Sequence, residues 1–403
     1  MRAKLYVAMV GLPARGKSTM AKRIREGLRE DGIQAAIFNN GNMRRELFGS
    51  ESTKAAFYDP TNLKSYDARE YICRKNFEAA REYLACGGDV AILDATNARP
   101  SRRAMLEASL TDHPVLFIEC VNEDPVLVET CIRRKANLPE YAGYSAEEAY
   151  ESFNARIRYY ESIYCPLSVE RYWMRVDTTA NRILDEHPCE DSPYYSAIRD
   201  ILVTMWVRRL FLARHGQTVY NIEGRIGGNP ALTEKGQEQA AALATHLRDK
   251  TIAWVFTSTR LRSLQTAAPL LAARVGTTHM ALKEFDEINA GDCEEMSYED
   301  IRRTMPQVTL QRNADKYHYV YPNGESYAIL RERVRRGLRR ALFLAGDAPL
   351  MIVGHQAINR VILSLFLLRR SEDIPYTFVP QNQYYHICTL PRRKVFELVH
   401  YSA

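Results

Sequence analysis

The sequence lacks the patterns that mark zinc-binding, disulfide-stabilised and membrane-spanning proteins. Its 8 cysteines are scattered, and none forms a C-x-x-C pair or a Cys/His cluster with the spacing of zinc ligands. We therefore expect reduced thiols and a cytoplasmic protein. No apolar run approaches the about 20 residues that a membrane-spanning helix needs; the run 361–368 has the length of one core helix. Repeats, low-complexity segments and a signal peptide ahead of the first predicted strand are also missing.

The length and charge of the chain set its broad class. At 403 residues the chain is too long for one small core, which favours two domains. A hydrophobic content of 46% and a charged content of 26% are typical of a globular protein. The net charge of +6 is compatible with nucleic acid, a membrane surface or anionic small substrates. Arginines beside tyrosines favour phosphorylated ligands, although a solvated basic face explains most of the charge.

The first half opens with a phosphate-binding loop. An apolar strand is predicted over 5–10, and residues 11–18 then match G-x-x-x-x-G-K-[ST]. An amphipathic helix follows to residue 31, so the motif has the strand before it and the helix after it that it requires. Backbone N–H groups of such a loop cradle phosphates, Lys17 reaches the β- and γ-phosphates, and the Ser18 hydroxyl holds Mg²⁺. The sequence therefore predicts a nucleotide site.

Strands and helices alternate through the rest of the first half. Further strands are predicted over 33–38, 89–93 and 115–120, and alternation of this kind implies a parallel sheet with right-handed crossovers. Asp94 stands at the tip of a strand, where an acid can serve Mg²⁺ or the accepting hydroxyl. The alternative is that Asp94 only caps the following helix.

Cations arrive from six elements or turns of this half. Nucleotide kinases need such residues in a lid, and sugar-phosphate kinases need them to grip the phosphate that is not transferred. Sequence spacing does not choose between these two uses. On the predicted helix 145–164, one of these arginines shares a face with Tyr160, one turn away. The six cations are Arg44, Arg45, Arg69, Arg102, Lys135 and Arg156.

A polar, proline-punctuated stretch at 187–193 reads as a linker. A short helix over 194–203 is expected to bridge it to the next strand. We place the domain boundary near Val207, which gives domains 1–206 and 207–403.

The second half places two histidines at strand ends. Arg214 and His215 follow an apolar strand at 210–213, which suits a histidine nucleophile whose phosphate is neutralised by the guanidinium. Gly216 is expected to let a substrate approach the backbone. His355 follows a second buried strand, and Arg262 lies near a predicted helix N-terminus. A lone His355 is more often structural, but two imidazoles and two arginines can surround one phosphoryl group without a metal.

A general acid is harder to choose. Glu287 is a candidate for protonating the leaving alkoxide, but four other carboxylates lie close to it in the sequence: Asp286, Asp292, Glu294 and Glu295. The residues alone do not select one. A loop carrying Asn221, Arg225 and the glycines 227–228 is expected to wrap the transferred phosphate.

Longer motifs of the first half resemble a known family. The runs G-L-P-A-R-G-K-S, F-N-N-G-N-M-R-R-E, D-A-T-N and R-I-R-Y-Y-E-S-I-Y-C-P-L are similar to the kinase half of 6-phosphofructo-2-kinase/fructose-2,6-bisphosphatase. The resemblance implies that Lys17, Ser18 and Asp94 serve ATP, Mg²⁺ and the 2-hydroxyl of fructose 6-phosphate. It implies an ATP loop made of Gly11, Ala14, Arg15, Gly16, Lys17, Ser18 and Thr19. It implies sugar-phosphate contacts from Arg44 or Arg45, Arg69, Thr96, Arg102, Lys135, Arg156 and Tyr160.

The second half resembles the same family. R-H-G, S-x-x-x-R and a later G-H are typical of histidine phosphatases, and R-I-G-G, D-E-I-N-A-G-D-C-E-E and H-Q-A-I-N-R are similar to the fructose-2,6-bisphosphatases. The resemblance implies that His215 accepts the phosphoryl group and that Glu287 is the acid. It implies that the 2-phosphate is held by Arg214, Asn221, Gly227, Arg262 and His355. It implies that the sugar and its 6-phosphate are held by Tyr298, Arg312, Lys316, Tyr327, Gln356 and Arg360.

The family match predicts two α/β domains, a P-loop kinase-like parallel sheet followed by a histidine phosphatase domain of the phosphoglycerate mutase type. It implies a homodimer formed through the kinase half, no metal for the phosphatase, and a role in controlling glycolysis and gluconeogenesis. The sequence departs from the family at Asn122, where animal members carry cysteine, and at Gln217, where many members carry glutamate. We expect no catalytic thiol, with Cys120 in the core. The helix leading to Lys135 is one residue shorter than in the family.

Two other functions remain open at this stage. One is a P-loop kinase fused to a phosphatase that acts on nucleotides or nucleic-acid ends; against it, the sequence has no nucleic-acid-binding module and no pattern of stacking aromatics. The other is a non-catalytic nucleotide-sensing switch, which would need few of the predicted catalytic residues. We therefore expect sugar phosphates as ligands, without nucleic acid or membrane partners.

Overall fold

The computed structural model describes residues 2–59, 61–187, 192–367, 369–390 and 393–401. The chain divides into two compact units, Met1–Met205 and Trp206–Ala403, one residue before the boundary expected from sequence. The greater part of the predicted linker, 188–191, lies outside the described residues.

Unit 1 is built on a six-stranded sheet in the order β2-β3-β1-β4-β5-β6, parallel except for the antiparallel pair of β5 and β6. Its strands are β1 (Leu5–Val10), β2 (Ala35–Asn39), β3 (Val90–Asp94), β4 (Val115–Val121), β5 (Trp173–Asp177) and β6 (Arg182–His187). Its helices are α1 (Lys17–Glu30), α2 (Asn40–Phe48), α3 (Leu63–Ala85), α4 (Pro100–Ser109), α5 (Pro125–Ala136), α6 (Ala146–Glu161) and α7 (Tyr195–Val203). Its 3₁₀ turns are η1 (Gly49–Thr53), η2 (Ala55–Tyr58) and η3 (Pro139–Tyr141).

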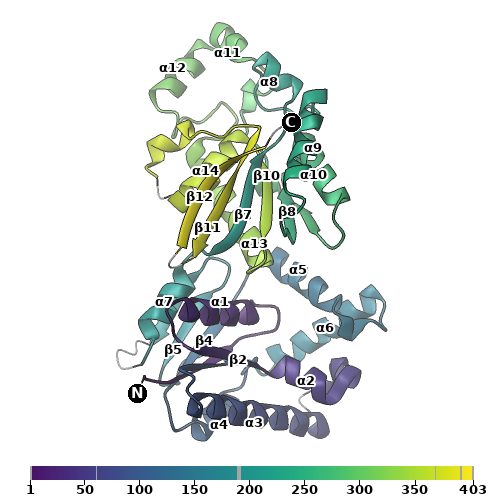
Figure 1. The fold of residues 1–403 in the computed structure, drawn as a ribbon, viewed down its shortest axis with the longest axis vertical. Helices are drawn as coiled ribbons and strands as arrows, with labels where there is room; N and C mark the ends of the chain where they lie inside the picture. The colour runs from purple at the N-terminus through teal and green to yellow at the C-terminus, as the bar shows by residue number, and fades with distance from the viewer. Residues whose placement is uncertain (1, 60, 188–191, 368, 391–392, 402–403) are drawn as a thin grey trace. The chain divides into compact units, whose positions relative to one another are not determined.

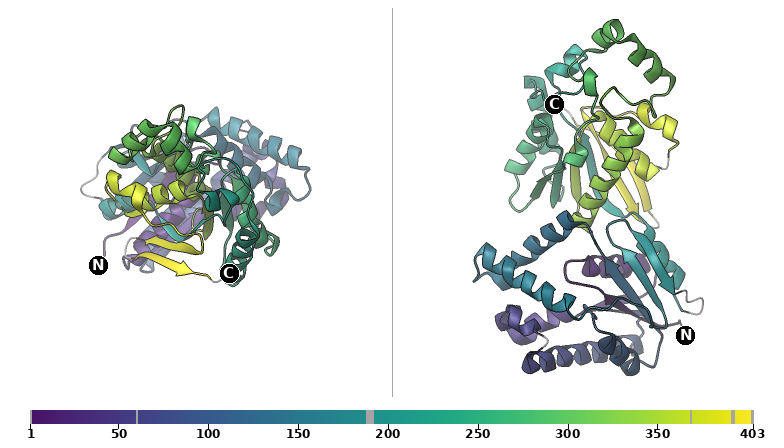
Figure 2. Two further views of the ribbon diagram at one scale, coloured as in Figure 1. Left: turned by 90° about the horizontal axis from the view of Figure 1, so that it is seen from above. Right: turned by 180° about the vertical axis from the view of Figure 1, so that it is seen from behind.

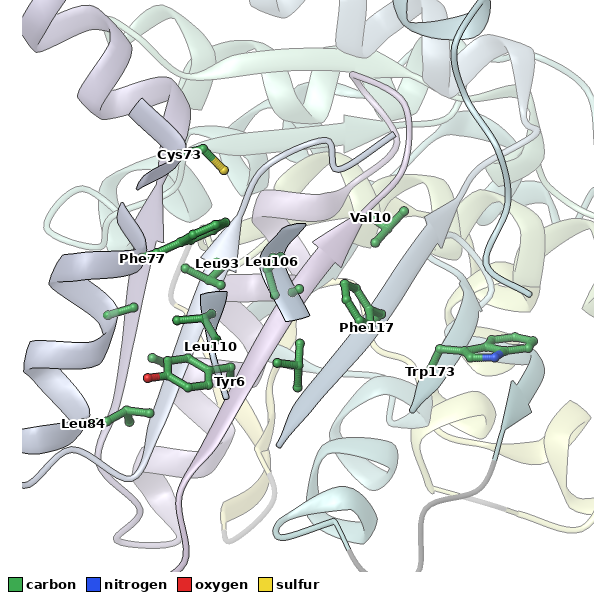
Figure 3. Close-up of a cluster of buried hydrophobic side chains, with 14 of the residues drawn as sticks. Tyr6, Val10, Cys73, Phe77, Leu84, Leu93, Leu106, Leu110, Phe117 and Trp173 are labelled. Atoms are coloured by element: carbon green, nitrogen blue, oxygen red, sulfur yellow. The ribbon is translucent and has the colours of Figure 1, made fainter. Parts of the chain in front are cut away.

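The central strands of the unit 1 sheet, β1, β3 and β4, are buried between helices. All six residues of β1 are buried, as expected for a central parallel strand. Figure 3 shows one face, where Tyr6 and Phe117 of the strands pack against Phe77 of α3 and Leu106 of α4. α3 and α4 lie together on one side of the sheet, and α1 lies on the other (Figure 1 and Figure 2).

Helix boundaries follow local capping. α3 begins four residues before the expected start at residue 67, because the Asn62 side chain accepts a hydrogen bond from the Ser65 N–H and caps it. α6 begins after Ser145, which forms a capping box with Glu148. The strands around the phosphate loop lie within two residues of the predicted bounds. Because they are parallel, their carboxyl ends form one edge of the sheet.

Unit 2 has a second six-stranded sheet in the order β12-β11-β7-β10-β8-β9, with β11 antiparallel to β7 and to β12. Its strands are β7 (Val207–Arg214), β8 (Trp254–Thr257), β9 (Thr278–Ala281), β10 (Leu350–Gly354), β11 (Gln383–Leu390) and β12 (Arg393–His400). Its helices are α8 (Val219–Glu223), α9 (Glu234–His246), α10 (Leu261–Ala272), α11 (Tyr298–Thr304), α12 (Pro306–Ala314), α13 (Tyr327–Ala345) and α14 (Gln356–Leu367), and its 3₁₀ turns are η4 (Lys283–Phe285), η5 (Gly291–Cys293) and η6 (Ser371–Tyr376).

The core of unit 2 fixes three strand ends side by side. Phe211 of β7 and Met351 of β10 pack with Leu243 of α9 and Leu270 of α10 on one face of the sheet. β10 lies between β7 and β8, parallel to both. The carboxyl ends of these three strands therefore meet at one edge, where ligands bind in open α/β sheets.

Candidate active sites

The phosphate loop of unit 1 needs its glycines. Gly11 has φ 132°, and a Cβ on it would lie 2.6 Å from the Cys120 carbonyl oxygen. Gly16 has φ 89° where the loop enters α1. Both positions therefore exclude an ordinary side chain. The Gly11 N–H donates to the Thr96 carbonyl 3.0 Å away, which joins the loop to the segment after β3.

Lys17 is enclosed at the start of α1. Only 9% of the residue is exposed, and its Nζ donates to the Leu12 carbonyl at 2.6 Å. Burial lowers the pKa of Lys17 to about 8, and the nearby Asp94 carboxylate opposes that shift. Oxygens of a bound phosphate would favour the protonated form of Lys17 and so oppose the lowering of its pKa by burial.

Asp94 ends β3 beside β2, in register with Asn39. It is 4% exposed and accepts a hydrogen bond from the Asn39 amide. The interpretation of Asp94 as a helix cap is wrong, because the next helix, α4, is N-capped by Arg99. The carboxylate of Asp94 and the exposed hydroxyl of Ser18 are oxygen donors of the kind Mg²⁺ prefers. Among the described residues, no group of three or more His, Cys, Asp or Glu could hold a metal.

Cys120 is buried next to these groups. It is 1% exposed, and burial raises the pKa of its thiol to about 12. The expected core position is confirmed, and a thiolate nucleophile there is excluded. Asn122 is 3% exposed and accepts from the Asp124 N–H through its Oδ1 at 2.9 Å.

The two adjacent arginines of α2 differ sharply. Arg44 is 4% exposed, pairs with Glu140, and donates to the Ser52 carbonyl at 2.5 Å and the Tyr58 hydroxyl at 2.6 Å. Arg45 has a side chain that is 42% exposed, with its guanidinium 3.6 Å from Glu140. Arg44 is therefore committed to protein contacts, whereas Arg45 is accessible to a ligand.

Tyr58 gathers several of the other predicted residues. The Arg156 guanidinium lies 4.0 Å from the centre of the Tyr58 ring, and the Tyr160 ring lies 5.9 Å from it. Tyr58 was not among the residues predicted from the sequence, because a single tyrosine before a loop carries no pattern. The shared contact confirms that Arg156 and Tyr160 project from one face of α6.

The remaining predicted cations of unit 1 lie around this cluster. Arg69 donates to the Phe57 carbonyl, and Arg102 pairs with Glu70. Lys135 lies in the last turn of α5, and burial together with Arg156 and Arg134 lowers its pKa.

In unit 2 the two histidines meet at adjacent strand ends. Gly354 of β10 is in register with Arg214 of β7, and the His215 N–H donates to the Gly354 carbonyl at 3.0 Å. The ring centres of His215 and His355 are 5.1 Å apart. Ser258, which follows β8, contacts His355 Nε2 through its hydroxyl at 2.7 Å.

Hydrogen bonds fix which nitrogen of each histidine carries the proton. His215 Nδ1 lies 2.7 Å from the Gly216 carbonyl; because a carbonyl only accepts, Nδ1 donates and Nε2 keeps its lone pair. Burial, Arg262 and Arg214 together hold the pKa of His215 well below its usual value, which keeps the imidazole neutral and nucleophilic. His355 Nδ1 accepts from Arg262 Nε at 3.2 Å, so its Nε2 carries the proton.

Gly216 serves the fold in a way that differs from the expectation. A Cβ on Gly216 would lie 2.5 Å from the Gly236 carbonyl oxygen. The missing side chain therefore admits the first turn of α9 and leaves this face closed to a substrate. The expected approach of a substrate to this glycine is wrong.

Glu287 is the carboxylate that the structure brings to the arginines of the site. It raises the pKa of both Arg214 and Arg262 against the lowering caused by their burial. Its Oε1 accepts from the Ile288 N–H at 3.0 Å and its Oε2 from the Ala357 N–H at 3.5 Å. The Ala357 N–H belongs to the first turn of α14, a favourable position for negative charge.

The competing carboxylates have structural partners. Asp286 accepts from the Thr259 N–H at 2.8 Å, and Asp292 accepts from Asn323 at 3.1 Å. Glu294 accepts from the Gly228 N–H at 2.6 Å. It also lies against Gly227, where a Cβ would be 1.9 Å from its Oε2. These acids shape the loop around the site.

Asn221 lies in the capping box of α8. Its Oδ1 accepts from the Thr218 N–H at 3.0 Å and from Gln381 at 2.8 Å. Arg214 donates to the Val379 carbonyl at 3.4 Å, and Arg262 donates to the Gly228 carbonyl at 2.9 Å.

A second group of cations and tyrosines lines this unit. Arg360 donates to the Tyr327 hydroxyl at 3.1 Å, and Arg312 donates to the Tyr321 hydroxyl at 2.7 Å with its guanidinium 5.6 Å from the Tyr298 ring centre. Arg360, Tyr327, Arg312 and Tyr298 all belong to the predicted sugar-binding set, whereas Tyr321 was not predicted.

Lys316 and Gln356 complete the predicted sugar-binding set. Lys316 Nζ lies 4.7 Å from the Tyr376 ring centre. Burial, Arg312 and Arg360 lower the pKa of Lys316 to about 8. Gln356 is the first residue of α14.

Gln217 faces away from this chemistry. Its N–H donates to Gln239 at 2.8 Å, and its Oε1 accepts from the Thr233 hydroxyl at 3.2 Å.

Both halves match known families. Residues 1–178 match the 6-phosphofructo-2-kinase model, and residues 210–401 match branch 1 of the histidine phosphatase superfamily. The mouse 6-phosphofructo-2-kinase/fructose-2,6-bisphosphatase 1 is 34% identical over 93% of this chain and 79% of its own. The Caenorhabditis elegans protein of the same family is 33% identical over 94% of this chain and 85% of its own.

The chain belongs to the 6-phosphofructo-2-kinase/fructose-2,6-bisphosphatase family. The predicted family and the predicted two-part α/β fold class are confirmed. Similar solved structures include the alpha-ribazole phosphatase from Shigella flexneri, with 25% identity and a TM-score of 0.45 over 48% of this chain and 96% of that one. They also include a mycobacterial glucosyl-3-phosphoglycerate phosphatase, with 24% identity and a TM-score of 0.42 over 49% of this chain and 100% of that one. In the described part of this family member, no helix has the length and apolarity needed to cross a bilayer.

Proposed function

We propose that this chain is a bifunctional enzyme that makes fructose 2,6-bisphosphate from fructose 6-phosphate and ATP and hydrolyses it back. The observation that carries the proposal is the paired His215 and His355 with Arg214 and Arg262 in a chain that also holds a phosphate loop. Family membership over 93% of the chain supports the substrate. The same membership supports a role in controlling glycolysis and gluconeogenesis.

In unit 1 the proposed reaction moves the ATP γ-phosphoryl group to the 2-hydroxyl of fructose 6-phosphate. Gly11, Gly16 and Lys17 would hold the phosphates, and Ser18 with Asp94 would hold Mg²⁺, which neutralises phosphate charge when bound. Asp94 also stands where it can accept a hydrogen bond from the attacking hydroxyl. Phosphoryl transfer needs positioning and charge neutralisation more than covalent chemistry, so cations dominate this proposed site.

For the sugar phosphate, the accessible cations are the better candidates. Arg45 is more exposed than Arg44, whose guanidinium is already bound by Glu140, Ser52 and Tyr58. We therefore assign the sugar-phosphate contact to Arg45 and a supporting structural role to Arg44. Arg69, Thr96, Arg102, Lys135, Arg156 and Tyr160 complete the proposed pocket.

In unit 2 the proposed reaction passes through a phosphohistidine. The Nε2 lone pair of His215 attacks phosphorus, the N–P bond forms, and the bond from phosphorus to the sugar 2-oxygen breaks. Glu287 gives its proton to that departing oxygen. Water then attacks the phosphohistidine, gives a proton back to Glu287, and releases phosphate from His215.

The positive groups of unit 2 would stabilise the charge on the phosphoryl oxygens. Arg214 and Arg262 would donate to them, with Asn221 and the loop at Gly227 enclosing the group. The Nε2–H of His355, which contacts the Ser258 hydroxyl at 2.7 Å, would have to exchange that contact for a phosphoryl oxygen. Tyr298, Arg312, Lys316, Tyr327, Gln356 and Arg360 would hold the sugar and its 6-phosphate. This arrangement needs no metal, because protein donors supply the neutralising charge.

The resemblance to the family also supports a homodimer formed through the kinase half, and the unpaired cysteine pattern supports a cytoplasmic location. Sedimentation of the purified protein would test the first of these.

The deciding experiment measures both activities on one purified preparation. ATP-dependent phosphorylation of fructose 6-phosphate is compared with that of oligonucleotide termini, and release of phosphate from fructose 2,6-bisphosphate is followed in parallel. Turnover of the sugar substrates in both assays is expected. Turnover of oligonucleotide ends alone, or of neither substrate, would contradict the proposal.

A further inference from the structure

One face of α13 supports the segment that carries Glu287. Arg333, Gly337 and Arg340 are spaced i, i+4 and i+7, so they share this face. A Cβ on Gly337 would lie 2.6 Å from Glu284 Cβ and 3.0 Å from the Phe285 ring. Only a glycine there lets the helix approach η4 so closely. Arg340, one turn further on, pairs with the Glu284 carboxylate.

Arg333 binds the main chain of this segment directly. Its Nη1 donates to the Asp286 carbonyl at 2.8 Å and to the Glu284 carbonyl at 3.1 Å. Its Nη2 lies 3.4 Å from the Glu287 carbonyl. One guanidinium thus holds the backbone before Glu287 and at Glu287 itself.

Glu325 holds Arg333 in turn and closes the other end of the segment. Arg333 donates to it through Nε at 2.9 Å and through Nη2 at 2.6 Å, the two-pronged geometry that favours arginine over lysine. Glu325 Oε2 also accepts from the Asn289 N–H at 3.0 Å, and the Glu325 N–H donates to the Asn289 carbonyl at 2.8 Å. The segment 284–289 is therefore fixed on both sides of Glu287.

We propose that Arg333, held by Glu325, is a positioning residue that fixes Glu287 for proton transfer to the leaving oxygen. The inference rests on the proposed phosphatase function of unit 2. Arg333 acts only through the Glu287 backbone and makes no contact of its own with the reacting atoms.

The proposal makes a chemical demand that a purely structural role does not. Proton donation matters when the leaving oxygen is a poor leaving group, as a sugar oxygen is. It matters little for p-nitrophenyl phosphate, whose oxygen departs as a stable phenolate without a proton. Loss of a general acid costs about 10² to 10⁴ in rate, and a displacement of about 1 Å costs about 10². Loosening Glu287 should therefore separate the two kinds of substrate.

The test uses Arg333→Lys in the full chain. We measure kcat/KM for fructose 2,6-bisphosphate, for alkyl phosphates and for p-nitrophenyl phosphate, because kcat/KM reports the steps through phosphohistidine formation. A loss of about 100-fold is expected for the first two and of less than about threefold for the third. Arg340→Lys, which changes a neighbouring contact on the same helix face, is the matched control and should leave all three rates within about threefold. The kinase activity of each variant reports on the integrity of unit 1.

An equal loss for all leaving groups, or no loss for any, overturns the proposal. Glu325→Gln gives a second measurement if Arg333→Lys fails to fold, and it should show a smaller loss with the same dependence on the leaving group. Wild-type protein that cleaves alkyl and aryl phosphates but leaves fructose 2,6-bisphosphate intact contradicts the proposed function, while the alkyl-to-aryl comparison still decides the role of Arg333. Wild-type protein that cleaves no phosphate monoester overturns both.

Discussion

The two candidate sites differ in how the protein compensates their cations. In unit 1, Arg44 and Arg45 share the Glu140 carboxylate, and Arg102 pairs with Glu70. In unit 2, Arg262 donates to His355 and a carbonyl, Arg360 donates to Tyr327 and a carbonyl, and Lys316 contacts a carbonyl. Within the described part of the chain, none of these last three is in an ion pair. These three cations of unit 2 therefore remain available to pair with a ligand. In unit 1, Arg44, Arg45 and Arg102 already pair with protein carboxylates, which fix their positions.

Burial lowers the pKa of predicted site cations in both units, including Lys17, Arg69 and Lys135 in unit 1. Burial lowers the pKa of Arg214 and Arg262, and burial with these arginines holds His215 well below its usual pKa. In unit 1 the pKa of Arg102 is raised, because Cys73 and Glu70 outweigh its desolvation. A buried positive charge is unfavourable until an anion enters, so the cations with lowered pKa values in both units favour binding of a phosphate group.

The largest effects should come from substitutions that abolish one activity and leave the other unchanged. His215→Ala removes the proposed nucleophile, so hydrolysis of fructose 2,6-bisphosphate should fall by about 10⁴-fold or more. The kinase rate should stay within about twofold, because His215 belongs to the other unit. Parallel assays of both rates check this, and equal loss of both in a folded variant would refute the division of labour.

Lys17→Met is the reciprocal control. It removes the buried cation of the phosphate loop, so the kinase rate should fall by about 10³-fold. Hydrolysis of fructose 2,6-bisphosphate should be unaffected.

A smaller effect should separate two neighbours within unit 1. Arg44→Met leaves the Glu140 carboxylate, 9% exposed, without its buried partner, which costs about 3 kcal/mol of unfolding free energy. Arg45→Met should leave stability unchanged and raise KM for fructose 6-phosphate by about 10- to 100-fold, the cost of one charge-assisted hydrogen bond. Urea unfolding and initial-rate kinetics on the two variants check both parts. If the two variants exchanged these effects, the assignment of Arg45 to the ligand would be wrong.

The pH dependence of the phosphatase should report the uncompensated charge of unit 2. The pKa of Lys316 is lowered to about 8 by burial, Arg312 and Arg360, so its charge is present below pH 8 and lost above it. We expect kcat/KM for fructose 2,6-bisphosphate to fall about fivefold between pH 8 and pH 9. Lys316→Arg keeps its charge throughout this range and should remove the decline; a decline that persists in this variant belongs to another group.

The sign of the stability effect follows from the same shift. The folded pKa of Lys316, about 8, lies below the unfolded value, so the unfolded chain binds more protons between about pH 8 and pH 10.5. Through this group, stability without phosphate should rise with pH across that window. Added inorganic phosphate should weaken this rise, because it favours the charged amine.

Sequence alone predicted the strand ends and the loop, because these depend on short local patterns. Lys17, Asp94, His215 and His355 each follow an apolar strand, and parallel strands bring such positions to one edge. Arg44 and Arg45 could not be told apart, since their difference depends on Glu140 in η3, about 95 residues away. Pairing across such a separation is a tertiary effect with no local signal.

The irregular segment around Glu287 shows the second limit. Five carboxylates lie within ten residues, and no period of 2 or 3.6 orients them. The choice is made by α13, whose Arg333 and Gly337 fix the backbone, and by Thr259, Asn323 and Gly228, which engage the competing acids. The strands β5, β6, β9, β11 and β12 were also not predicted. β6 and β12 are mostly exposed, so no buried apolar run marks them in the sequence.

The smallest effect concerns Gln217, two residues after His215. Its Oε1 already accepts a hydrogen bond from the Thr233 hydroxyl at 3.2 Å, and a carboxylate can accept the same bond. Gln217→Glu would add a negative charge that raises the pKa of His215. Because burial and two arginines hold that pKa well below its usual value, His215 should remain neutral at pH 7. We therefore expect phosphatase kcat to change by less than about threefold, the size of a screened charge effect. A change beyond tenfold would mean that residue 217 affects the electrostatic field at the His215 imidazole as strongly as Arg214 and Arg262 do. The contrast between the two sites would then depend on the loop at Gln217 as well as on the arginines.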